Sequence, residues 1–211
     1  MNIGLRYSGF QQIGPYTAFE RDEDGNKLDS TYWGKGVPVR AYGWPEPRLI
    51  VRYALNDNNS IKASVTRNNQ FIHPVTNSGS SLPTDIWVPS TYLVKPQIAW
   101  QYSAGYFRNF ADNDYEASVE AYYKRMQNQV EYREGYTPSI SDPEEDFVFG
   151  KGWAYGAELF LKKNNGKFTG WLGYTLAWTW RKFPDLNDGD KFPAKYDRRH
   201  DLGCDRYVRP Q

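Results

Sequence analysis

Residues 167–180 read KFTGWLGYTLAWTW, in which nearly every second side chain is large and apolar or aromatic, including Leu172, Tyr174, Leu176 and Trp178. The residues between them are mostly small or polar. A period of two places alternate side chains on opposite faces of a β-strand, whereas helical faces repeat every 3.6 residues. This stretch therefore predicts a strand with one apolar face.

The same alternation recurs through the chain. It is found in residues 3–7, 48–55, 61–65, 97–106, 115–125 and 153–162, and a further strand is expected to begin near His200. The connections between these segments alternate in length. Tight turns rich in Asn, Asp and Gly are expected at 56–59, 111–114 and 163–166, and long connections at 10–46, 70–96, 128–151 and 182–199.

Alternating turns and loops are typical of transmembrane barrels, whose short turns face the periplasm and whose long loops face outside. The pattern predicts an all-β fold, an antiparallel up-and-down transmembrane β-barrel segment of about seven or eight strands. Two alternatives stay open. One is a soluble β-sandwich that acts as a carbohydrate-binding module, and the other is a small self-contained eight-stranded barrel that acts as an adhesin or structural protein.

The composition agrees with amphipathic strands. Aromatic residues make up 17% of the 211 residues in an otherwise polar chain, which does not fit disorder. The formal net charge of +1 provides no overall field for nucleic acid, so no nucleic-acid partner is expected. The single cysteine, Cys204, excludes an internal disulfide framework and a cysteine-based zinc site.

Several segments resemble TonB-dependent outer-membrane receptors of the Bacteroidetes type. They are residues 47–64 as a strand–turn–strand unit, 95–107, 116–129, the motif GxxYGxE at 152–158 and the motif DRxHxL at 197–202. The resemblance covers nearly all of residues 2–202. Its order and spacing are more specific than any single motif.

The resemblance implies a receptor that imports a scarce nutrient, such as a ferric siderophore, haem, cobalamin or an oligosaccharide. It implies outer-membrane lipid around the barrel, and a TonB complex that acts through an N-terminal plug that this chain lacks. Such barrels have about 22 strands around a plugged lumen, so seven or eight strands would supply part of a wall that transports nothing alone. No cofactor is expected.

The chain is expected to be incomplete at both ends. Its first residues show no signal peptide, although the resemblance places the parent protein in the outer membrane. Residues 1–202 are predicted to be a partial receptor barrel, and 203–211 an atypical tail that arises from a frameshift or truncation artefact. The reason is that Arg206 falls in line with Leu202 and Cys204, where a charge near the bilayer midplane would cost roughly 2–4 kcal/mol.

Two sets of site residues are predicted. Aromatic side chains in the long connections are candidates to stack on a sugar or planar chelate, with packing inside the loops as the alternative: Tyr32, Trp33, Trp87 and Tyr92. The second set is expected to face lipid: Ile98, Trp100, Tyr102, Val119, Leu159, Leu161, Leu172, Tyr174, Leu176 and Trp178.

Catalysis and metal binding find little support, and the chain is not expected to be an enzyme. His73 is interpreted as a solvated loop histidine without a positioned partner. The acidic residues Asp142, Glu144, Glu145 and Asp146 lack the spacing of a calcium loop and are interpreted as a solvated acidic loop. Residues 22–26 are interpreted as a turn tip.

Overall fold

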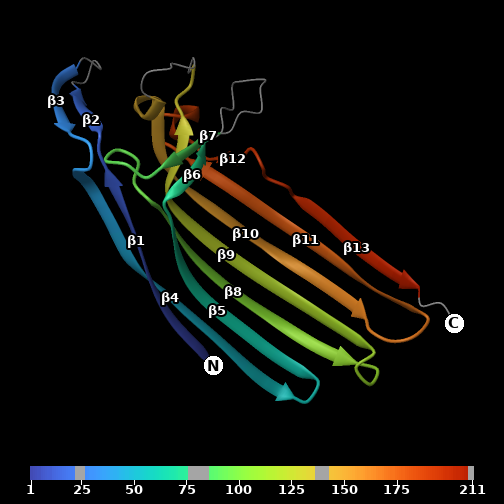
Figure 1. Ribbon diagram of the computed structural model, residues 1–211. Helices are drawn as coiled ribbons and strands as arrows, with labels where there is room; N and C mark the ends of the chain where they lie inside the picture. Colours follow the sequence, from blue (N-terminus) through green and yellow to red (C-terminus); the bar gives the residue numbers. More distant parts are fainter. Residues whose placement is uncertain (22–26, 76–85, 136–142, 209–211) are drawn as a thin grey trace.

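The computed structural model describes residues 1–21, 27–75, 86–135 and 143–208. Eight long strands lie side by side in one curved antiparallel sheet (Figure 1). In spatial order they are β1 (Asn2–Ile13), β4 (Pro38–Asn56), β5 (Asn59–Gln70), β8 (Gln97–Phe110), β9 (Tyr115–Tyr132), β10 (Phe147–Lys163), β11 (Phe168–Lys182) and β13 (His200–Val208). The spatial order follows the chain order, so the sheet is an up-and-down meander.

Short elements occupy the long connections. They are the hairpin β2 (Tyr16–Arg21) and β3 (Lys27–Trp33), the hairpin β6 (Ile72–Val75) and β7 (Ile86–Pro89), β12 (Phe192–Pro193) beside β11, and the 3-10 turns η1 (Pro143–Asp146) and η2 (Asn187–Gly189). All of them gather at one end of the sheet, which we call the loop end (Figure 1).

The tight turns lie together at the opposite end, the turn end. The β8–β9 turn holds Ala111, Asp112 and Asn113 at φ of 52°, 51° and 67°, and Gly166 in the β10–β11 turn has φ of 103°. Asn, Asp and Gly adopt this left-handed region more readily than other residues, which explains the composition of these turns. The predicted alternation of tight and long connections is confirmed.

The single meander contradicts both alternatives to a barrel segment. A β-sandwich needs a second sheet packed on the first, but among the described residues the long strands form one sheet. A small closed barrel needs its first and last strands to pair, but β1 pairs with β4 and β13 pairs with β11. The structure is therefore an open wall.

The strands extend further into the connections than the sequence predicts. A tilted strand needs only about 9–11 residues to cross a bilayer, whereas β4, β9 and β10 have 19, 18 and 17. Their additional residues lie at the loop end. There, Val130 and Tyr132 of β9 and Phe147 of β10 form a small core with Val75 of β6, Val88 of β7 and Val94. A second core contains Val148, Phe183 and Leu186.

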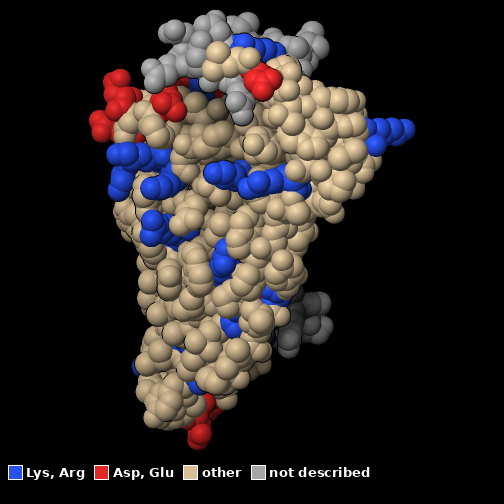
Figure 2. Space-filling view, turned by 90° about the vertical axis from the view of Figure 1, so that its left-hand side faces the viewer, with Lys and Arg blue, Asp and Glu red and all other residues tan. Residues whose placement is uncertain are grey.

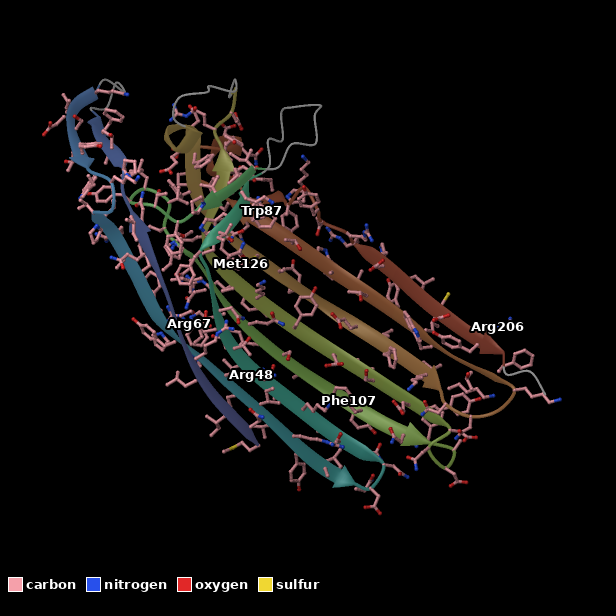
Figure 3. All side chains as sticks on the ribbon, viewed as in Figure 1. Arg48, Arg67, Trp87, Phe107, Met126 and Arg206 are labelled. Carbon is pink, nitrogen blue, oxygen red and sulfur yellow. The ribbon has the colours of Figure 1, made fainter. Side chains whose placement is uncertain are left out.

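β13 continues past Leu202 to Val208. Arg206 pairs with Gly170 and lies on the same face as Leu202 and Cys204, as the alternation predicts. However, it lies near the turn end rather than midway along the strand, and its guanidinium carbon is 5.2 Å from the ring centre of Phe168 (Figure 3). The midplane cost assumed from the sequence therefore does not apply, while the origin of residues 203–211 stays a prediction.

Candidate functional site

The strand register divides the main sheet into two chemically different faces. One row across seven strands contains large apolar or aromatic side chains: Tyr53, Ile61, Tyr106, Val119, Leu159, Tyr174 and Leu202. We call this side the apolar face. The register places all ten residues predicted to face lipid on it. Most of the large side chains in this row are exposed, for example Val119 at 51% and Leu159 at 47%.

A second row repeats the pattern nearer the loop end. It contains Ile3, Leu49, Val65, Tyr102, Tyr123, Tyr155 and Trp178. Between the two rows the central strands carry Ala63, Ala104, Ala121 and Ala157 side by side. A soluble monomer rarely exposes an apolar surface that extends across a whole sheet, so this face needs a covering partner.

The opposite side, the polar face, carries charges in two groups. Basic side chains lie on β4 and β5, where Arg52 and Lys62 are cross-strand neighbours. Acidic side chains predominate on β9, β10 and β13, where Glu116, Glu120, Glu158, Asp201 and Asp205 outnumber Lys124 and Lys162 on the same face. Viewed from the side of β1 and β4, Lys and Arg form a band near the loop end, and Asp and Glu lie mainly at the two ends (Figure 2).

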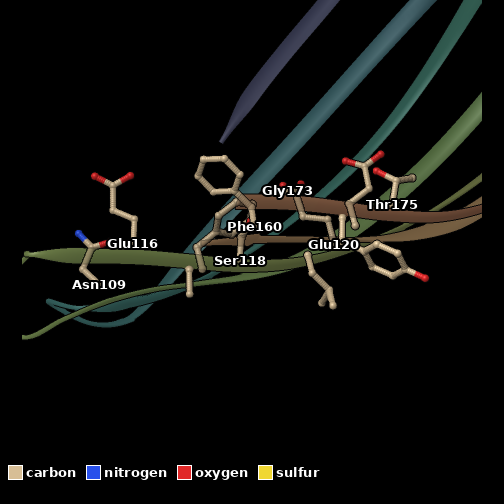
Figure 4. A pocket seen from close by; sticks show the side chains of 12 residues that line it. Asn109, Glu116, Ser118, Glu120, Phe160, Gly173 and Thr175 are labelled. Atoms are coloured by element: carbon tan, nitrogen blue, oxygen red, sulfur yellow. The ribbon is translucent and has the colours of Figure 1, made fainter. Parts of the chain in front are cut away.

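Two adjacent hollows lie on the polar face near the turn end. One, of about 370 Å³, is lined by the acidic side chains Glu116, Glu120 and Glu158 (Figure 4). The other, of about 300 Å³, is lined by the basic side chains Arg52 and Lys62 and also by Asp57 and Glu116. Phe107 and Glu116 line both hollows. The Nζ of Lys62 lies 4.0 Å from the Phe107 ring centre, so the second hollow combines basic, acidic and aromatic groups.

The loop end brings two of the four predicted loop aromatics together. The rings of Trp33 and Tyr92 lie 5.6 Å apart, and Tyr16 lies 6.0 Å from Trp33. Tyr32 and Trp87 do not join them and are 68% and 69% exposed. The reason is the strand period: Tyr32 and Trp33 are consecutive in β3, so their side chains point to opposite sides.

Glu144 connects this aromatic cluster to the neighbouring loop. Its carboxylate accepts hydrogen bonds from the Thr91 hydroxyl at 2.7 Å and the Tyr16 hydroxyl at 3.2 Å. Burial, and then the negative charge of Glu144, raise the pKa of the Tyr16 hydroxyl, so it remains a donor. For Glu144 the interpretation as a solvated acidic loop is therefore wrong. The part of that loop at 136–142, with Asp142, and the turn tip at 22–26 lie outside the described residues.

His73 is not the solvated loop histidine that the sequence suggests. It is fully buried, its Nε2 lies 3.0 Å from the Ser90 hydroxyl, and burial lowers the pKa of its imidazole to about 4. Ser90 is also fully buried. Because neither side chain is accessible to a substrate, this histidine–serine pair packs the β6–β7 hairpin rather than forming a catalytic pair.

The described residues give no sign of a metal centre or a helical membrane span. They contain no cluster of three or more His, Cys, Asp or Glu side chains placed to hold a metal ion. Over the same residues, no helix has the length and apolar character to cross a bilayer.

Comparisons with known proteins identify the architecture. Residues 1–202 match a family model described as TonB dependent receptor-like, beta-barrel. A comparison with curated proteins found no match. Seven solved chains match in structure.

Three of these solved structures illustrate the likeness. The ferric-catecholate import receptor Fiu from E. coli K12 has 17% identity and a TM-score of 0.55 over 98% of this chain and 29% of that one. The outer-membrane ferripyoverdine receptor of Pseudomonas aeruginosa has 16% identity and a TM-score of 0.53, over 88% and 22%. The FrpB iron transporter from Neisseria meningitidis has 13% identity and a TM-score of 0.52, over 89% and 24%. This chain thus spans about a quarter of their length, and at these identities the likeness concerns the fold.

Proposed function

The chain belongs to the family of TonB-dependent receptor-like β-barrels, and from this membership we propose that it forms part of the wall of an outer-membrane receptor that imports a scarce nutrient. The observation that carries the proposal is the apolar face, whose large side chains continue from strand to strand and are exposed. Lipid is the partner that covers such a face. Outward apolar and inward polar residues alternate along transmembrane barrel strands for this reason.

The polar face would then line the lumen. Its side chains remain hydrated or contact the plug, which a different part of the receptor supplies. The basic side chains on β4 and β5 and the mainly acidic group on β9, β10 and β13 suit a plug with complementary charges. In this scheme the turn end faces the periplasm, and the TonB complex acts through the plug to drive import rather than through any catalytic group of the wall.

The nutrient would meet the loop end first. Tyr32 and Trp87 offer exposed aromatic faces for a sugar or planar chelate, whereas Trp33 and Tyr92 pack against each other. The ferripyoverdine and ferric catecholate named for two solved neighbours are ferric siderophores, one of the nutrient classes expected here, and a ferric chelate is a suitable first probe.

Labelling of adjacent positions tests the wall assignment. Cys204 is the only cysteine and is exposed, so a Cys204→Ser chain provides a background for Val119→Cys on the apolar face and Ser118→Cys on the polar face. Each variant is labelled with an environment-sensitive fluorophore and folded into vesicles that contain brominated phosphatidylcholine. Bromine should quench the label at position 119 strongly and the label at 118 weakly. Equal quenching at both positions would contradict the proposal.

Aromatic substitutions test the nutrient contact. In the receptor that contains this chain, Tyr32→Ala and Trp87→Ala should each weaken binding of a ferric catecholate, haemin, cyanocobalamin or maltoheptaose by about three- to tenfold, because exposed aromatic contacts contribute about 1 kcal/mol. Tyr53→Ala is the matched control, since Tyr53 is 66% exposed at the turn end. Unchanged binding of all four compounds in both loop variants would remove these residues from the site.

A further inference from the structure

Charges on the apolar face are of one sign only. Between the tight turns and the last apolar row at the loop end, the described strands place Arg67, Arg125, Arg108 and Arg206 on this face but no Asp or Glu. The segment of β8 from Trp100 to Arg108 contains nine residues, which is the length that a tilted strand needs to cross a bilayer. The basic groups therefore mark the two borders of the apolar band.

The loop-end border alternates basic and aromatic residues. Across successive strands the register gives Arg67, Trp100, Arg125, Trp153 and Trp180 in one row. The guanidinium carbon of Arg67 lies 5.9 Å from the ring centre of Trp100. At the turn-end border, the guanidinium carbon of Arg206 lies 5.2 Å from the ring centre of Phe168, and the Nζ of Lys163 lies 5.5 Å from that of Tyr115. Arg108, by contrast, lies between Asn59 and Ala117 and has no aromatic neighbour in its row.

Further ammonium groups surround the aromatic part of this row. Lys191 places its Nζ 4.6 Å from the ring centre of Trp153, and Lys151 and Lys182 are cross-strand neighbours two residues closer to the loops. A hollow of about 400 Å³ opens here, lined by Tyr123, Trp153, Tyr155, Trp180 and Lys191. The hollow thus has aromatic walls and one positive charge at its rim.

We propose that this row and hollow bind the phosphate-bearing headgroup of an anionic lipid in the outer leaflet. Guanidinium and ammonium groups recognise phosphate oxygens, and the aromatic walls contact the apolar or sugar part of the same molecule. A phosphate-free lipid would leave Arg67 and Arg125 without a counter-charge at the membrane border. The inference rests on the proposed function, because it requires the apolar face to meet lipid.

Lipid binding to the full chain in maltoside micelles tests the site. Native mass spectrometry measures the affinity for monophosphoryl lipid A and for the same lipid after enzymatic removal of its phosphate. The chain should prefer the phosphorylated form. The double variant Arg67→Gln/Arg125→Gln should lose roughly 30-fold of that affinity, because each basic residue near an anionic surface contributes about a factor of five. Arg108→Gln, on the same face at the turn end, should leave the affinity unchanged.

Three outcomes would overturn the inference: equal affinity for both lipids, an unchanged affinity in the double variant, or an equal loss in Arg108→Gln. Lys191→Gln, outside the main strands, is a second variant. It should reduce the affinity for the phosphorylated lipid about fivefold and leave the affinity for the dephosphorylated lipid unchanged. Bromine quenching at position 119 separates the two proposals. If the label is quenched but the lipids bind equally, only the phosphate site fails, whereas an unquenched label rejects the wall assignment itself.

Discussion

At the scale of single residues, burial at the loop end keeps the imidazole of His73 neutral. Its imidazole is fully buried beside Ser90, and its pKa of about 4 lies below the value of about 6.5 expected in an unfolded chain. As the pH falls, the unfolded chain therefore binds the proton first. The stabilising contribution of His73 is complete above about pH 6.5 and is lost progressively as the pH falls toward 4.

We therefore expect the stability of the chain in micelles to depend on His73 in this pH range. The pKa difference corresponds to roughly 3 kcal/mol in the free energy of unfolding. Urea unfolding at several pH values from 7.5 to 4 tests this dependence, and the free energy of unfolding is compared between the natural chain and the His73→Gln variant. Because both chains contain the same carboxylates, their contributions cancel in that comparison. The difference should change between pH 6.5 and 4 and be constant above pH 6.5. A folded-state imidazole pKa above 6.5 by NMR would contradict the prediction.

Glu144 joins segments that are distant in the sequence. Its two neutral donors, Thr91 and Tyr16, come from the segment after β7 and from β2. Glu144→Ala removes the acceptor and leaves partly buried hydroxyls, which should weaken the loop-end packing by about 1–3 kcal/mol. Limited proteolysis should cut the loops faster in Glu144→Ala, while Glu144→Gln should show a smaller effect because its amide oxygen still accepts. Equal protection in all three chains would show that these bonds contribute nothing.

At the scale of elements, the β8–β9 turn contains strain that a single change relieves. Ala111 adopts φ of 52° and its carbonyl accepts a hydrogen bond from the Asp114 amide at 2.9 Å. A non-glycine residue in this region costs roughly 1–2 kcal/mol. Ala111→Gly should therefore raise stability by up to about 1 kcal/mol, since the more flexible unfolded chain offsets part of the gain.

Thermal unfolding in micelles measures this change. Ala104→Gly is the matched control, because Ala104 lies in the middle of extended β8, where glycine should lower stability by about 0.5–1 kcal/mol. The two substitutions are chemically identical but should shift the midpoint in opposite directions. A decrease in both would show that the left-handed conformation of Ala111 does not limit stability.

Much of the wall could be predicted because one chemical signal repeats in each strand. The alternation around Leu172 and Leu159 specifies strand, face and register together, since a slip of one residue would turn every apolar side chain to the other side. Each tight turn carries residues that tolerate positive φ. Local sequence therefore determines both the strands and their connections at the turn end.

The loop end could not be predicted in the same way. Pro45 and Pro47 discourage a strand assignment, yet both lie within β4 opposite Tyr7 and Leu5, where the strand continues beyond the bilayer length. Burial of His73 depends on pairing with β7, where Val88 lies opposite it, and on Ser90, both of which are distant in sequence. Trp33 and Tyr92 meet only because two loops pack together. These contacts are tertiary and have no periodic signal.

At the scale of the whole molecule, the structure combines an unclosed sheet with an uncovered apolar face. β1 and β13 each have one edge without a described partner strand, and unpaired edges are templates for pairing with other chains. The apolar side chains that stabilise a wall in lipid are unfavourable in water, because exposing apolar area to water costs about 25 cal/mol per Å². Both the edges and the face should therefore drive association in water.

We expect the isolated chain to aggregate in detergent-free buffer and to import nothing by itself. Light scattering after dilution out of urea, with and without maltoside, checks the first part. Micelles cover the apolar face and should suppress most scattering. Val119→Glu and Leu159→Glu, which place adjacent charges on that face, should reduce aggregation in water and impair insertion into vesicles, whereas Ser118→Glu on the polar face should change neither. A monodisperse natural chain that unfolds cooperatively without detergent would show that the exposed face is not a membrane surface.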